Sequence, residues 1–189
     1  MRLLPFFFLI TFCLFSQNES VEKHPIPDWL IKNWEAHMTG NGAWITDNSE
    51  FKSENEPFDA YGMKWEWGLG KKSLKGNLYC IRNGENVQTV WEFLNYWDPE
   101  TGTARMIQIG GTGMIGKGKI WQLEDGSTKS KEQFTAPDGT AFTVGHHVFW
   151  DDGNMATQSF DIKDETWTKR RFYVWKPEKT TLGNHPKYN

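Results

Sequence analysis

Two different hydrophobic periodicities divide the chain after its first 26 residues. Between residues 29 and 38, apolar side chains recur with helical spacing, with Pro27 ahead of them and Gly40 behind. Proline suits the first turn of a helix and glycine marks its end, so this segment predicts one short helix. From Gly42 onward the pattern changes to alternation of apolar and polar residues, which is typical of β-strands.

The clearest alternation lies between residues 61 and 69. Its large apolar side chains are separated by glycines, a lysine and a glutamate, and they are Tyr61, Met63, Trp65, Trp67 and Leu69. Successive side chains of a strand point to opposite faces, so these five are expected to share one buried face.

About ten such segments follow the predicted helix, at near-regular spacing. The turn sequences between them are Asn83-Gly84, Asp98 to Gly102, Glu124 to Gly126, Pro137 to Gly139, Asp151 to Asn154 and Lys163 to Glu165. Short strands joined by such turns indicate an all-β meander, and closure removes the exposed edges of its sheet. We expect a single antiparallel closed β-barrel of about ten strands in up-and-down order over residues 27–177, preceded by the helix. An open sandwich of two sheets is the alternative fold.

The N-terminus has the pattern of a secretory signal peptide over residues 1–17. Arg2 precedes an apolar run from Leu3 to Phe15, which is too short for the roughly 20 residues of a spanning helix. No second apolar stretch of that length follows, so no integral membrane segment is expected. A lipid anchor at Cys13 is not expected either, because the bulky Phe12 precedes it.

The remaining ends of the chain are expected to lie outside the barrel. Residues 18–26 are interpreted as a flexible lead-in and residues 178–189 as a C-terminal tail. With a signal peptide removed, the protein is expected in the periplasm or outside the cell.

Composition excludes several classes of function. The net charge is −3 and is spread without long runs, so nucleic acid is not an expected partner. Only Cys80 remains beyond the signal peptide, and its apolar neighbours predict an inert core thiol. No spacing of His and Cys suits a zinc site. Eleven tryptophans supply much of the core, and nothing in the sequence indicates an oligomeric state.

Residues on the first and last strands of the predicted barrel resemble the pattern of a known family. The helix leading to Gly42-Ala43-Trp44, with Arg170-Arg171 on the last strand, resembles the calycin pattern of lipocalins and fatty-acid-binding proteins. Ten strands and the glycine-rich corner at residues 110–113 are more similar to nitrobindin-like barrels. The resemblance implies that the Trp packs against an Arg, and that the barrel carries haem, a fatty acid or another small hydrophobic molecule. A few calycins are enzymes.

The strand from Thr140 to Trp150 is expected to place His146 inside the barrel. Its more apolar face consists of the even positions Phe142, Val144, His146, Val148 and Trp150. Turn positions then predict an inward polar row across neighbouring strands, made of Ser130, Glu132, His146, Ser159 and Arg170. A slip of one residue in the register would turn His147 inward in place of His146.

Three interpretations of this polar row remain open. A carboxylate, an imidazole and a guanidinium cannot be buried unpaired without several kcal/mol of penalty. They form a structural ion pair between Glu132 and Arg170, anchor a ligand, or act in acid/base catalysis.

We expect a barrel that binds a small, partly apolar ligand rather than an enzyme. Trp65, Trp67 and Trp91 are predicted to line its cavity, with polar anchorage from Glu132, His146, Ser159 and Arg170. Haem is one possible cofactor, with His146 as its axial ligand. The alternatives are an enzyme that uses His146 and Glu132 on a hydrophobic or sugar-like substrate, and a structural or carbohydrate-contacting surface domain.

Overall fold

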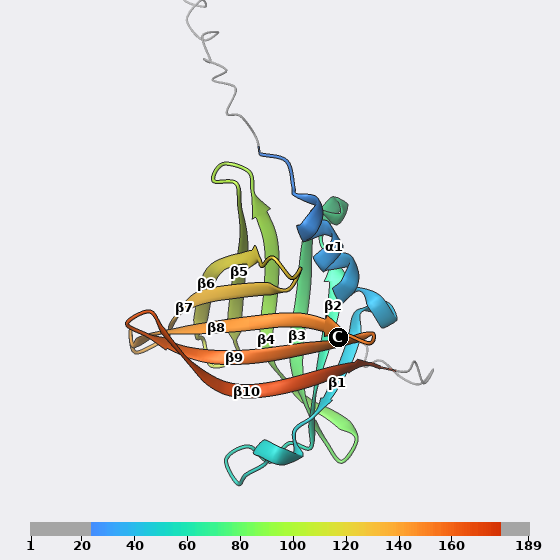
Figure 1. Ribbon diagram of the computed structural model, residues 1–189. Helices are drawn as coiled ribbons and strands as arrows, with labels where there is room; N and C mark the ends of the chain where they lie inside the picture. The colour runs from blue at the N-terminus through green and yellow to red at the C-terminus, as the bar shows by residue number, and fades with distance from the viewer. Residues whose placement is uncertain (1–23, 179–189) are drawn as a thin grey trace, which may run out of the picture.

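Ten antiparallel strands close into one barrel, with a short helix packed at one end (Figure 1). The computed structural model describes residues 24–178. Helix α1 spans Asp28–His37. The strands are β1 (Ala43–Asp47), β2 (Ala60–Trp67), β3 (Ser73–Arg82), β4 (Glu85–Asp98), β5 (Thr103–Gly110), β6 (Ile115–Gln122), β7 (Thr128–Thr135), β8 (Ala141–Asp151), β9 (Asn154–Lys163) and β10 (Thr166–Pro177). The predicted fold class, strand order and helix are thus confirmed, whereas the predicted signal peptide and the Cys13 position lie outside the described residues.

The barrel closes where the first strand meets the last. Trp44 and Ile45 of β1 pair with Pro177 and Lys176 of β10, and every other strand pairs with its neighbours in the sequence. Closure leaves no exposed sheet edge, which is why a meander of ten strands can be stable without a second layer.

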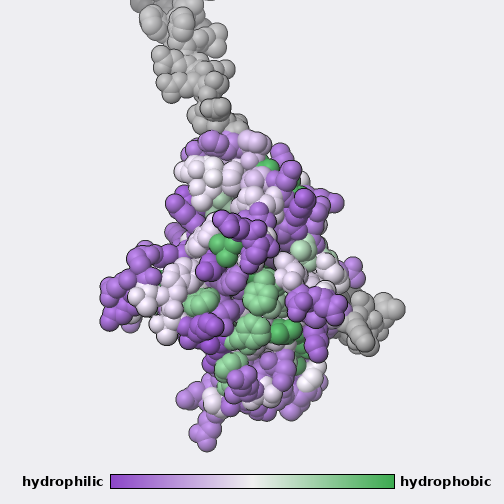
Figure 2. All heavy atoms as spheres, viewed as in Figure 1, coloured by the Kyte–Doolittle hydropathy of each residue, from purple (hydrophilic) through white to green (hydrophobic). Residues whose placement is uncertain are grey.

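The outer surface of the barrel is mostly polar. Figure 2 shows this hydrophilic surface, interrupted by hydrophobic side chains gathered over the region of β8 to β10. On these strands, Phe149 and Phe172 stack with ring centres 6.2 Å apart, and Phe172 and Val174 are exposed.

Helix α1 forms because its apolar side chains share one face, and that face closes an end of the barrel. Leu30 and Trp34 are fully buried, and Trp34 contacts Trp67 edge to face at 6.3 Å. The indole Nε1 of Trp44 on β1 donates to the carbonyl oxygen of His37 at 2.8 Å. The helix is therefore fixed to the barrel wall by both apolar packing and a buried hydrogen bond.

The connection between β1 and β2, residues 48–59, lies at the end of β1 that is farther from the helix. Glu56 of this connection forms a bidentate ion pair with Arg171 of β10, and the Tyr61 hydroxyl donates to the same carboxylate at 2.5 Å. The bonds from Arg171 hold the pKa of Glu56 below its usual value. The connection is thus held to both β10 and β2, the two strands that flank β1.

Two local predictions are wrong. Leu69 is 96% exposed, because β2 ends at Trp67 and the chain turns through Gly70 with a φ of 62°. The contact between Trp44 and an Arg is replaced by other partners, since Trp44 packs against Trp150 with ring centres 5.5 Å apart and bonds to the helix.

Candidate functional site

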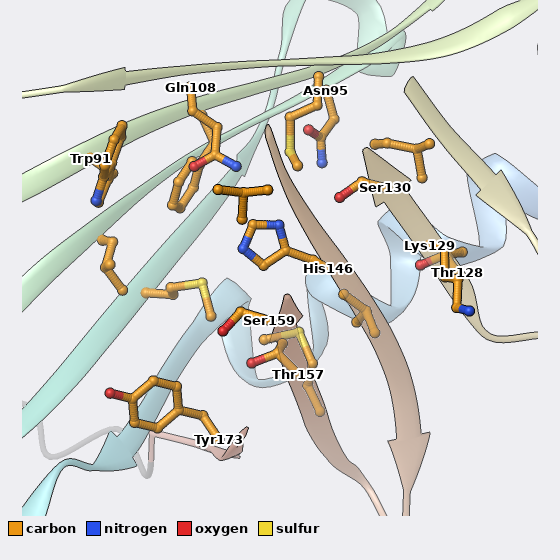
Figure 3. A pocket seen from close by; sticks show the side chains of 18 of the residues that line it. Trp91, Asn95, Gln108, Thr128, Lys129, Ser130, His146, Thr157, Ser159 and Tyr173 are labelled. Atoms are coloured by element: carbon orange, nitrogen blue, oxygen red, sulfur yellow. The ribbon is translucent and has the colours of Figure 1, made fainter. Parts of the chain in front are cut away.

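A cavity of about 540 Å³ occupies the barrel interior. Apolar side chains from nearly all strands line it, and those from β2 to β4 are Met63, Trp65, Leu78, Trp91 and Phe93. A belt of polar side chains crosses the strands from β4 to β9, and it consists of Asn95, Gln108, Thr128, Ser130, His146, Thr157 and Ser159 (Figure 3). Apolar surface with a few convergent polar groups is typical of small-molecule sites.

Glu132 is the centre of the polar belt, directly behind the cavity surface. It is fully buried, and its two carboxylate oxygens accept three hydrogen bonds. Gln108 Nε2 donates to Oε2, the Ser130 hydroxyl donates to Oε1 at 2.5 Å, and His146 Nδ1 lies 3.3 Å from Oε1. A buried carboxylate needs such donors to offset its loss of water.

His146 is held by this carboxylate with its ring in the cavity. Figure 3 shows the ring among Gln108, Ser130 and Ser159. Because Glu132 occupies Nδ1, the nitrogen left for a ligand is Nε2, for which the described residues supply no hydrogen-bond partner. A neutral imidazole with hydrogen on Nδ1 presents Nε2 as an acceptor.

Gly118 makes this arrangement possible, because it leaves room on β6 between Glu132 and Gln108. A Cβ atom at this position would lie 2.2 Å from the Lys131 carbonyl oxygen and 2.5 Å from Glu132 Cγ. Any larger residue therefore forces the backbone of β7 or the Glu132 side chain to move.

We expect Gly118→Ala to lower the free energy of unfolding by roughly 1 to 3 kcal/mol, because it overpacks the wall at Glu132. Gly111→Ala is the matched control, since its Cβ would meet no atom closer than 3.7 Å. Urea titrations followed by tryptophan fluorescence measure both variants. Equal stability of the two variants would show that Glu132 has room to move.

The structure brings together most of the residues proposed for the site. Trp65, Trp91, His146, Ser159 and Arg170 border the cavity, and the predicted pairing of Ser130 with His146, and of His146 with Ser159, is confirmed. Trp67 is absent from the lining. It packs under Trp34 instead, because α1 covers that end of the barrel.

The two arginines of β10 have different partners from those expected. The register shifts between Lys169 and Phe172, and this bulge takes Arg170 out of the polar row. Arg170 forms an ion pair with the exposed Asp161 at 3.4 Å, so the expected pair with Glu132 is not formed. The backbone N-H of Arg171 donates to the Ser159 hydroxyl at 3.1 Å.

His147 points to the outer surface and forms a separate chain of hydrogen bonds. Its Nε2 lies 2.8 Å from the Ser127 hydroxyl, which donates to Asp125 at 2.5 Å. In a catalytic triad the acid orients the histidine, and the serine donates to that histidine. Here the acid takes the serine proton, so the arrangement does not activate a nucleophile.

Helix α1 supplies a further histidine to the cavity wall. His37 is buried between Trp65 and Trp150, with ring centres 4.9 and 5.2 Å from its own. Its Nδ1 donates to the Asn33 carbonyl oxygen at 2.8 Å. Desolvation by burial lowers the pKa of His37 to about 4, although the bond to Asn33 partly opposes this shift. The imidazole is therefore uncharged at neutral pH.

No family model matches the chain, and a search of the curated proteins finds no match. The closed barrel of ten antiparallel strands is consistent with a calycin-like fold. Within residues 24–178, no helix is long and apolar enough to cross a membrane. The same residues contain no group of three or more His, Cys, Asp or Glu side chains placed to hold a metal ion.

Sequence reasoning missed two polar residues of the cavity, Asn95 and Gln108. A signal for both exists, because each is a polar residue at an inward position of an otherwise apolar strand. On β5 the inward positions are Ala104, Met106 and Gln108. A polar side chain at an inward position needs a buried hydrogen-bond partner. The alternation of inward and outward positions along each strand could therefore have identified both residues.

Proposed function

We propose that the barrel binds a small, partly apolar ligand in its interior. The observation that carries this proposal is the cavity of about 540 Å³, whose lining combines aromatic and aliphatic side chains with a belt of hydrogen-bonding side chains. His146 is the central anchor of the ligand, because Glu132 fixes its orientation and leaves Nε2 toward the cavity. Burial of the ligand's apolar part against the aromatic and aliphatic side chains supplies most of the binding free energy.

The alternative is an enzyme that uses His146 with Glu132 as an acid/base pair. The hydrogen bond between them supports it, since such a pair can move a proton. It would also require a second reactive group near Nε2. The one described cysteine, Cys80, is 1% exposed and its pKa is raised by desolvation, so it is a poor nucleophile.

The finer resemblance to nitrobindin-like barrels would make haem the ligand, with His146 Nε2 at an axial position. A carboxylate bonded to the other imidazole nitrogen is a common support for a metal-bound histidine, and Glu132 fits this role. The haem propionates would lack free cationic partners, because Arg171 is already paired with Glu56 and Arg170 with Asp161. The cavity therefore fits haem less well than a ligand without acidic groups.

Native mass spectrometry tests ligand binding directly. For this experiment the full chain is expressed in bacteria, recovered from the periplasm and purified without detergent. Its native mass is then compared with its denatured mass. We expect a stoichiometric excess mass that is lost on denaturation, and its value separates haem from a lipid or metabolite. Recovery from the periplasm with cleavage near residue 17 also tests the proposed export. A bare mass that persists after incubation with haem and a lipid extract would contradict the binding function.

We expect His146→Leu to weaken binding of N-phenyl-1-naphthylamine about tenfold, because the variant removes the anchor for its N-H group. This uncharged probe becomes fluorescent in an apolar site, so a fluorescence titration measures its dissociation constant. His147→Leu is the matched control, since it removes the neighbouring imidazole on the outer surface. Equal losses in both variants would place the probe outside the cavity.

A carbohydrate-contacting surface domain is the third possibility. It is supported by Trp121 and Trp167, whose rings meet edge to face at 6.3 Å outside the barrel. Binding of soluble oligosaccharides that is lost in Trp167→Ala but retained in His146→Leu would favour it over the cavity.

A further inference from the structure

We propose that the cavity selects electrically neutral ligands that carry an amide or hydroxyl group on a flat apolar body, and excludes carboxylate ligands. This inference rests on the proposed binding function and names the chemical class of its ligand. It is carried by the charged side chains that border the cavity, each of which is paired with a protein group or directed outward, and by two buried polar atoms without partners.

The arginines at the cavity are not free to bind an anion. Both terminal nitrogens of Arg171 donate to the carboxylate of Glu56. The Arg171 guanidinium also lies over the ring of Phe51, 5.0 Å from the ring centre. Arg170 pairs with Asp161 on the outer surface. A ligand carboxylate would have to displace one of these protein carboxylates.

The lysine that borders the cavity also directs its charge outward. Thr128 and Ser130 face the cavity, so Lys129 between them points to the opposite side of β7. Its ammonium lies 5.3 Å from the ring centre of Trp167, whose side chain covers the outer face of Gly145. The positive charge of Lys129 is therefore outside the barrel wall.

The two inward histidines do not supply an unpaired positive charge either. The ring of His146 already faces a protein carboxylate, because its Nδ1 lies 3.3 Å from Glu132 Oε1. His37 is buried and uncharged at neutral pH, and the groups facing it are Trp65, Trp150 and the Asn33 carbonyl oxygen. The described residues of the interior thus offer an anion no cation that lacks a protein partner, and an anion brought into it from water would remain uncompensated.

In the described part of the chain, two buried polar atoms of residues that line the cavity lack a hydrogen-bond partner. Asn95 and Trp65 both line the cavity and are each 5% exposed. Within residues 24–178, Asn95 Oδ1 and Trp65 Nε1 have no hydrogen-bond partner. Oδ1 is an acceptor and the indole N-H is a donor, so each lacks a neutral hydrogen-bonding partner of the kind that a ligand amide or hydroxyl group supplies. Phe93 stacks on Trp65 with ring centres 5.4 Å apart, which provides a flat apolar surface beside these atoms.

Calorimetric titration with 2-naphthamide and 2-naphthoate tests this selection at pH 7.5. The two probes share their rings and differ in one neutral or ionised group. We expect 2-naphthamide to bind at least about tenfold more tightly than 2-naphthoate. In Asn95→Leu the amide should lose about tenfold in affinity, whereas the control Asn77→Leu, which lies on the outward face of β3, should leave it unchanged. If Asn95→Leu fails to fold, Trp65→Phe removes the donor while it keeps a ring.

The outcomes separate the inference from the function on which it rests. Equal or tighter binding of 2-naphthoate overturns the selection of neutral ligands but leaves ligand binding intact. An unchanged preference in folded Asn95→Leu or Trp65→Phe overturns the assigned hydrogen-bonding site. Absence of binding by both probes, together with absence of N-phenyl-1-naphthylamine binding, counts against the proposed function itself.

Discussion

Trp44→Ala is expected to lower the free energy of unfolding by about 3 to 5 kcal/mol, the largest effect of any single change considered for this barrel. Trp44 is completely buried where β1 meets β10, and its ring packs against Trp150. Truncation leaves a large void at the closure of the barrel. It also removes the hydrogen bond from the Trp44 indole to the His37 carbonyl oxygen, which is one of the two attachments of α1 to the barrel wall.

Chemical denaturation monitored by circular dichroism measures this loss. Trp44→Phe is the graded control, because it keeps an aromatic ring but lacks the indole N-H, and its cost should be nearer 1 to 2 kcal/mol. A loss below about 1 kcal/mol in Trp44→Ala would mean that neighbouring side chains collapse into the space. The helix would then not depend on this contact.

Acid should destabilise the protein through His37 before its carboxylates are protonated. The pKa of His37 is about 4 in the folded protein, against an ordinary value of 6.5. Between these values the unfolded chain binds a proton that the folded protein does not, so stability falls as the pH falls from 6.5 to 4. Since one pKa unit corresponds to about 1.4 kcal/mol, the loss over this window is roughly 3 kcal/mol, and it levels off below pH 4.

The difference in unfolding free energy between the wild type and His37→Phe isolates this titration. Phenylalanine keeps ring contacts with Trp65 and Trp150 but does not titrate, so the wild type should lose stability relative to the variant as the pH falls. His147→Phe is the comparison, because the pKa of His147 is also lowered by desolvation but the ring is partly exposed. A pH-independent difference between wild type and His37→Phe would show that His37 is protonated without cost.

Local sequence patterns were sufficient for the strands, their order and the register of the central hairpins. Turn residues set where each strand ends, and alternation sets which face is buried, so Ser130, His146 and Ser159 could be aligned without a structure. The same reasoning failed at Arg170, because a bulge on β10 shifts the alternation by one residue. Nothing in the sequence around Arg170 marks that bulge.

The sequence by itself determined the strands, the helix and the pairing that aligns Ser130, His146 and Ser159, because these depend on neighbours in the chain or across one turn, whereas a two-sheet sandwich and an inward His147 stayed open. Only the tertiary structure decided what completes the site. Glu132 reaches Gln108 across the intervening strand β6 because Gly118 has no side chain there. Helix α1 covers Trp67 and brings His37 to the cavity wall. These contacts depend on how distant elements pack in three dimensions, and no local periodicity encodes that packing.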